Sequence, residues 1–125
     1  MRELNIPATV NTPSAVFDPQ LLSLKIEGRC IPENPAGFFK EIVQWTEEVF
    51  PQLSGKITII IRLEYINSGS SKQVLSFLRL VESFHGQDGK DLLLKWYYED
   101  DDEAIQELGE DLQSSLKLPV ELFVI

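Results

Sequence analysis

The stretch Ile57-Thr58-Ile59-Ile60-Ile61-Arg62-Leu63-Glu64-Tyr65-Ile66 is the most strand-like part of this 125-residue chain. It is dense in β-branched and aromatic residues, which favour strands. Apolar side chains occupy both alternating faces near its start, which predicts a central strand covered on both sides. The most helix-like pattern follows directly, with apolar residues at three- and four-residue steps. These are Val74, Phe77, Leu78, Val81 and Phe84.

Two strands and a helix are predicted before this unit. Residues 14–17 and 22–27 read as an antiparallel hairpin at a sheet edge, because the turn Asp18-Pro19-Gln20 separates them. Asn34-Pro35 then predicts a helix start, since asparagine caps helices and proline is favoured at the first helical position. Pro51 ends that helix.

The second half of the chain alternates strands and helices. Gly86 and Gly89 end the central helix, and residues 91–98 then alternate between apolar and polar. A third helix follows the acidic residues 99–103, and a last strand covers residues 120–124. The order ββαβαβαβ with about three helices predicts a single α/β domain over residues 1–125, with a mixed sheet and parallel crossovers. This order resembles the STAS-type domains of anti-sigma factor antagonists.

Bulk properties narrow the possible partners and compartment. The net charge of −9 argues against nucleic acid and against an anionic membrane surface, because both attract basic patches. A basic protein partner is compatible with this charge, but acidic solubility explains it equally well. A single cysteine, Cys30, forms no intrachain disulfide and suits a reducing compartment. With no signal-peptide pattern and no apolar run of about 20 residues, we expect a cytoplasmic protein.

The corner between the central strand and its helix carries the candidate site, residues Asn67-Ser68-Gly69-Ser70-Ser71-Lys72, which we call the serine corner. Backbone N–H groups at a helix start lack helical partners and favour an anion. Ser70 and Gln73 fit a capping box, which makes Ser70 the expected cap and leaves Ser68 as a free hydroxyl in the loop. A phosphoryl group on Ser68 would then lie near the helix start and Lys72. Alternatively, the polar side chains of the corner only satisfy backbone groups of a tight turn.

Other candidate groups favour structural roles. The acidic residues 99–103 do not match a calcium-binding loop and are better explained as the decoration of a helix start or as a partner-facing patch, so no metal or cofactor is predicted. Cys30 is interpreted as a buried or loop thiol. The aromatic residues Trp45, Trp96 and Tyr98 are expected in the core, whereas Tyr97 points to the opposite face of its strand as an exposed ring.

An enzymatic function is the alternative to a phosphorylated binding protein. A small hydrolase or phosphate-ligand-binding domain would use the serine corner as nucleophile or phosphate cradle. That chemistry needs a base within hydrogen-bond reach of a serine. The one histidine, His85, lies at the far end of the following helix, roughly 20 Å away at about 1.5 Å per residue. An unmodified structural adaptor is a third possibility.

Motifs along nearly the whole chain together resemble the SiaC-type regulatory phosphoproteins. They occur in the family order and are quite specific as a set. The matching segments are Ala8-Thr9, Thr12-Pro13, Val16-Phe17-Asp18-Pro19, Ile26-Glu27-Gly28-Arg29, Pro32-Glu33-Asn34, Phe38-Phe39, Trp45, Tyr65-Ile66-Asn67-Ser68-Gly69-Ser70-Ser71-Lys72 and Trp96-Tyr97-Tyr98-Glu99-Asp100-Asp101-Asp102.

The resemblance implies a binding protein rather than an enzyme. In the family, a dedicated Ser/Thr kinase phosphorylates a hydroxyl of the Tyr-x-Asn-Thr-Ser-Ser corner and a PP2C-type phosphatase removes the phosphate. The unphosphorylated form binds and activates a diguanylate cyclase in biofilm-regulating, partner-switch signalling through cyclic di-GMP. Carried onto this chain, the phosphoacceptor is Ser68, and Asn67, Gly69, Ser70, Ser71 and Lys72 form the switch loop. The chain departs from the family pattern at Ser68, usually Thr, at Gly69, usually Ser, and at Cys30-Ile31, usually Ser-Tyr.

Overall fold

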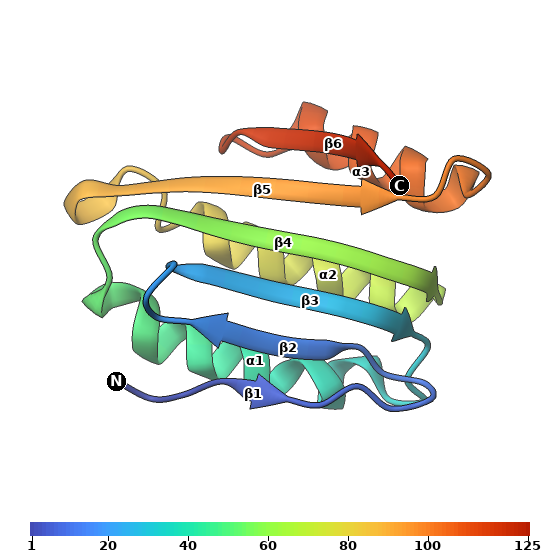
Figure 1. The fold of residues 1–125 in the computed structure, drawn as a ribbon, viewed down its shortest axis with the longest axis horizontal. Coiled ribbons are helices and arrows are strands. Elements are labelled where there is room, and N and C mark those ends of the chain that lie inside the picture. Colours follow the sequence, from blue (N-terminus) through green and yellow to red (C-terminus); the bar gives the residue numbers. More distant parts are fainter.

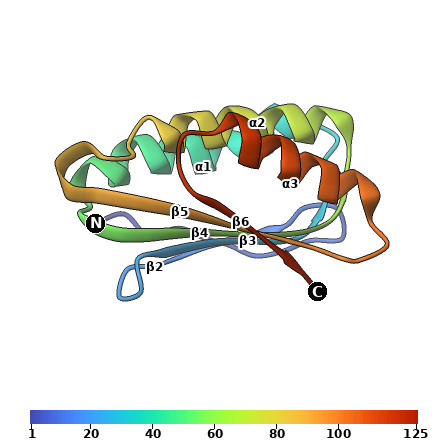
Figure 2. The same ribbon diagram turned by 90° about the horizontal axis from the view of Figure 1, so that it is seen from above.

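The computed structural model describes residues 1–125 and consists of one six-stranded sheet with three helices on one of its faces (Figures 1 and 2). The strands are β1 (Asn5–Ile6), β2 (Ser14–Asp18), β3 (Ser23–Cys30), β4 (Gly55–Ile66), β5 (Lys90–Tyr98) and β6 (Val120–Val124). The helices are α1 (Pro35–Val49), α2 (Ser68–Glu82) and α3 (Glu103–Ser115), with short 3-10 turns at Phe50–Gln52 and Gln87–Gly89. The predicted mixed sheet with three helices is confirmed. None of the helices is long and apolar enough to cross a membrane.

Strand order in the sheet follows chain order, from β1 at one edge to β6 at the other. The predicted hairpin is confirmed, with β2 antiparallel to β3 and Ala15 opposite Ile26. From β3 onward each neighbour is parallel, so α1, α2 and α3 are the crossover connections. Strand β1 was not predicted, because two residues are too few to show an alternating pattern. It pairs antiparallel with β2 and forms the edge of the sheet, where the hairpin was expected.

Strand β4 is central, but the expectation that it is covered on both sides is wrong. Its inward residues Ile57, Ile59 and Ile61 are buried beneath the helices. On the opposite face Ile60 is only half-buried, and Arg62 is exposed. Figure 2 shows all three helices on the same side of the sheet. The run of isoleucines misled the prediction because Ile60 is apolar without being covered by a second layer.

The two tryptophans anchor the core, as predicted. Trp45 on α1 and Trp96 on β5 are both 0% exposed and belong to a cluster of 28 buried hydrophobic residues. Each indole N–H has a backbone partner: Trp96 donates to the carbonyl of Ile105 at 2.9 Å, and Trp45 donates to that of Arg2 at 2.9 Å. Both rings are therefore buried without the cost of an unpaired donor.

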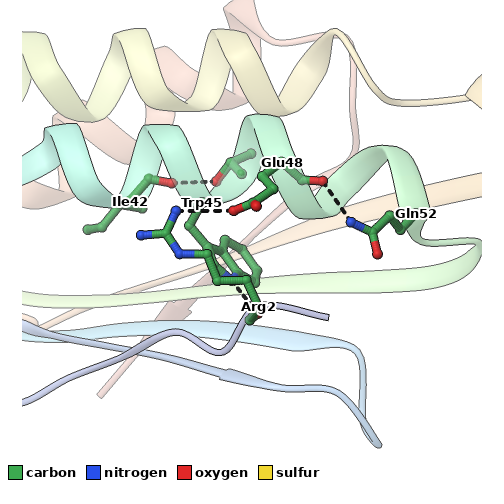
Figure 3. Close-up of polar contacts among 6 residues, drawn as sticks. Arg2, Ile42, Trp45, Glu48 and Gln52 are labelled. Atoms are coloured by element: carbon green, nitrogen blue, oxygen red, sulfur yellow. Dashed lines mark hydrogen bonds and ion pairs between the residues drawn. The ribbon is translucent and has the colours of Figure 1, made fainter.

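The N-terminal segment is fastened to α1 by polar contacts (Figure 3). Besides the bond from Trp45, the guanidinium of Arg2 lies 3.1 Å from the carboxylate of Glu48. Leu4 is buried, and its carbonyl accepts a hydrogen bond from the N–H of Phe17 at 3.0 Å. These contacts explain how a segment without a periodic pattern adds a strand to the sheet.

Candidate functional site: the serine corner

The helix that follows β4 is capped by Asn67, not by Ser70 as expected. The side-chain oxygen of Asn67 accepts a hydrogen bond from the Ser70 N–H at 2.9 Å, and α2 begins at Ser68. The prediction failed because both residues suit a cap, and the register of β4 decides which one reaches the helix start. Ser68 is consequently the first residue of the helix rather than a loop residue.

The three serines of the corner differ sharply in access. Ser68 is exposed, and its hydroxyl forms no hydrogen bond. Ser71 is half-buried, and its hydroxyl donates to the carbonyl of Asn67 at 3.4 Å. Ser70 is 0% exposed, and its hydroxyl oxygen has no well-formed hydrogen bond. Only Ser68 therefore presents a hydroxyl to solvent at the start of α2.

The buried Ser70 faces the end of β3. The thiol of Cys30, which is also 0% exposed, interacts with the Ser70 hydroxyl. Burial raises the pKa of the Cys30 thiol, and the contact with Ser70 opposes that shift only in part. Cys30 is thus a structural group, as predicted, since a thiol held protonated in an apolar site is a poor nucleophile.

Asn67 ties the serine corner to the loop after β3. Its side-chain amide donates to the carbonyl of Pro32 at 3.0 Å while its oxygen caps α2. Its backbone N–H donates to the carbonyl of Cys30 at 3.2 Å. Both halves of the Asn67 amide are therefore used, and the start of α2 is held in a fixed place against the sheet.

Gly69 sits directly against the start of α1. A Cβ atom built on Gly69 would approach Cγ of Pro35 to 3.0 Å, closer than ordinary van der Waals contact. A side chain at this position would require the Pro35 ring to move by a few tenths of an ångström. Lys72 is exposed and lies four residues after Ser68, a spacing that places both side chains on one side of the helix.

Tyr65 and Arg29 lie beside the corner. Neither of them was identified from the sequence as a candidate site residue. Tyr65 is 63% exposed, and the guanidinium of Arg29 lies 4.9 Å from the centre of its ring. Tyr65 also has a positive φ of 57°. The alternation of apolar and polar residues in a strand carries no signal for a left-handed backbone at one position. The conformation of Tyr65 therefore could not be predicted from the sequence.

An acidic hollow of about 440 Å³ lies at the carboxyl ends of β4 and β5. Its lining residues are Leu63, Glu64, Tyr65, Glu99, Asp101, Asp102 and Glu103. Asp102 caps α3 by accepting from the N–H of Ile105 at 3.1 Å, which confirms that the acidic run decorates a helix start. No three His, Cys, Asp or Glu side chains are grouped so as to hold a metal ion.

The remaining predicted groups lie away from the corner. His85 follows the far end of α2, where its Nδ1 accepts a hydrogen bond from the N–H of Leu92 at 3.1 Å. Tyr97 is on the uncovered face of the sheet as predicted, but it is half-buried because its ring stacks on Phe123 with centroids 5.0 Å apart. Neither group contributes to the chemistry of Ser68.

Comparison with known proteins gives one consistent result. The family model described as SiaC family regulatory phosphoprotein matches residues 6–125. One similar solved structure is the crystal structure of diguanylate cyclase SiaD in complex with its activator SiaC from Pseudomonas aeruginosa. The match has a TM-score of 0.87 at 28% identity and covers 98% of this chain and 100% of the matched chain. Apo-SiaC from the same organism gives 0.85 at 28% identity, with 98% and 99% covered.

A curated sequence agrees with the structural matches. An uncharacterised protein of Pseudomonas aeruginosa (strain UCBPP-PA14) is 31% identical over 119 residues, which is 95% of this chain and 94% of that protein. The fold and the matches along the full length define a regulatory phosphoprotein. The chain belongs to the SiaC family, and the resemblance drawn from its sequence motifs is thereby confirmed.

Proposed function

We propose that this protein is a cytoplasmic, non-enzymatic switch whose unphosphorylated form binds and activates a diguanylate cyclase. Its phosphoacceptor is Ser68, which a cognate Ser/Thr kinase phosphorylates and a PP2C-type phosphatase restores. The single observation that carries this assignment is the difference in access among the corner serines, because Ser68 alone is exposed. The other two hydroxyls are half-buried or fully buried.

The position of Ser68 suits a phosphate. A phosphoryl group adds a charge of about −1.5 to −2, and the first turn of a helix stabilises negative charge through its unpaired N–H groups. Lys72 lies one turn further along α2, within range of an ion pair with that phosphate.

The partner is proposed by analogy with the relative of known structure. SiaC of Pseudomonas aeruginosa is the activator of diguanylate cyclase SiaD and forms a complex with it. This chain covers all of that SiaC chain at a TM-score of 0.87, so the two share the backbone arrangement that supports binding in the relative. A diguanylate cyclase is therefore the effector that best fits this protein.

The arrangement around Ser68 gives little support to a hydrolase. A nucleophilic serine needs a base in hydrogen-bond reach, and the Ser68 hydroxyl has no hydrogen-bond partner. α2 runs from Ser68 to Glu82, which is about 20 Å at about 1.5 Å per residue. His85 lies beyond its far end and already accepts a bond from the Leu92 N–H. The nearby hollow is lined by carboxylates from other elements and does not include Ser68.

Phosphosite mapping tests the acceptor. The protein is incubated with its cognate kinase and ATP, and the phosphorylated residue is located by mass spectrometry. We expect one phosphate on Ser68, none on the variant Ser68→Ala, and normal incorporation in the matched control Ser71→Ala, three residues along the same helix. Phosphate on Ser71, or incorporation unaffected by Ser68→Ala, would reject Ser68.

A further inference from the structure

Tyr65 combines two properties that a purely structural residue rarely has. It is the only exposed aromatic residue of the chain, with 63% of its surface accessible to solvent. Its backbone also lies in the left-handed region, at a φ of 57°, which is unfavourable for a bulky L-residue. Such strain persists only where surrounding structure enforces it, and it concentrates at functional sites.

A β-bulge produces this conformation. Arg29 on β3 pairs with Glu64 on β4, but the next residue, Cys30, pairs with Ile66. Tyr65 is the extra residue of β4 at this point, so the alternation of side chains shifts by one. Ile66 packs against the core, while Tyr65 is turned out to solvent. A bulge that re-aims one side chain next to a functional site is a recurrent device in sheets.

The Tyr65 ring has one recorded side-chain contact. The guanidinium of Arg29 lies 4.9 Å from the ring centre, and Arg29 forms no ion pair that would draw it away. Two residues after Tyr65, the N–H of Asn67 is fixed to the carbonyl of Cys30 at 3.2 Å. The bulge and this hydrogen bond therefore fix the backbone from which the Tyr65 side chain projects, three residues before Ser68.

We propose that Tyr65 is the anchor by which the unphosphorylated protein holds its effector, inserting its ring into an apolar pocket on that partner. This inference rests on the proposed switch function and extends it to a contact residue. Tyrosine is enriched among the few residues that dominate the binding energy of protein interfaces. Ser68 is the first residue of α2 and follows Tyr65 by three residues in the chain. In this proposal, the charge and bulk of a phosphate on Ser68 oppose close packing of the partner at this end of the sheet.

Two substitutions separate binding from folding. In Tyr65→Gly the ring is lost, but the left-handed backbone becomes favourable, because glycine adopts positive φ without strain. Tyr65→Phe keeps the ring and removes the hydroxyl. Leu21→Ala is the matched control, since Leu21 is 72% exposed in the hairpin at the opposite end of the sheet. Affinity for the purified diguanylate cyclase is measured by isothermal titration calorimetry, and Tm by thermal denaturation.

We expect Tyr65→Gly to bind the cyclase at least tenfold more weakly with a Tm equal to or above that of the unsubstituted protein. Tyr65→Phe and Leu21→Ala should bind within about twofold, the scatter expected of exposed contacts that carry little energy. Full affinity in Tyr65→Gly, or a large fall in its Tm, would overturn the anchor role. If the unsubstituted protein and Ser68→Asp bind equally, the switch function fails instead, so the two failures are distinguishable.

Discussion

Replacing Asn67 by alanine removes two side-chain hydrogen bonds at once. The cap on the Ser70 N–H contributes about 1 kcal/mol, and the bond to the Pro32 carbonyl contributes about 1 kcal/mol. We therefore expect Asn67→Ala to lower the free energy of unfolding by about 2 kcal/mol. Asn34→Ala should lower it by about 1 kcal/mol, because Asn34 caps α1 through the Gly37 N–H and makes no second side-chain bond.

Asn67→Asp distinguishes the two contributions. A carboxylate still accepts from the Ser70 N–H, but it cannot donate to Pro32, so a loss of about 1 kcal/mol is expected. Urea unfolding followed by tryptophan fluorescence measures all three variants, since Trp45 and Trp96 are both buried and report loss of the core. A loss in Asn67→Ala no larger than in Asn34→Ala would refute the view that Asn67 bridges the corner to β3.

Three further outcomes follow, one from close packing at Gly109 and two from the burial of Cys30. Gly109→Ala should destabilise the protein by about 1–3 kcal/mol despite the better helix propensity of alanine, because its Cβ would lie 2.6 Å from Nε1 of Trp96; a raised Tm in thermal denaturation would contradict this. The Cys30 thiol should resist a thiol reagent such as DTNB at pH 8 in the native protein and react on unfolding, and rapid native labelling would show that it is accessible. Because its folded pKa is raised above the ordinary 9.0, its contribution to stability should be complete at neutral pH and decline as pH rises beyond about 9, a decline that Cys30→Ala should lack.

The sequence predicted the parallel half of the fold well, because each element there carries its own signal. Asn34 and Pro35 mark the start of α1, and the alternation of Leu92, Leu94 and Trp96 marks the buried face of β5. The two-residue strand β1 has no such pattern, and its place in the sheet comes from contacts with residues far along the chain, such as Trp45. Long-range contacts of this kind do not appear in a local period.

The sequence correctly placed the serine corner between β4 and α2, but it did not predict the internal arrangement of the corner. Asn67 and Ser70 are both good caps, and in the structure Asn67 takes the role directly after the bulged end of β4. The exchange of roles buries Ser70 and places Ser68 on the first turn of α2. The choice between two good caps and the position of a bulge both depend on the three-dimensional packing at the end of β4, which no propensity or spacing rule describes.

The central claim is that the phosphate on Ser68 controls binding of the effector. Its most direct test compares the affinity of one preparation for its diguanylate cyclase after stoichiometric phosphorylation and again after treatment with the PP2C-type phosphatase. We expect phosphorylation to weaken binding at least tenfold, the phosphatase to restore it, and Ser68→Ala to bind tightly throughout. Equal affinity before and after dephosphorylation would contradict the account.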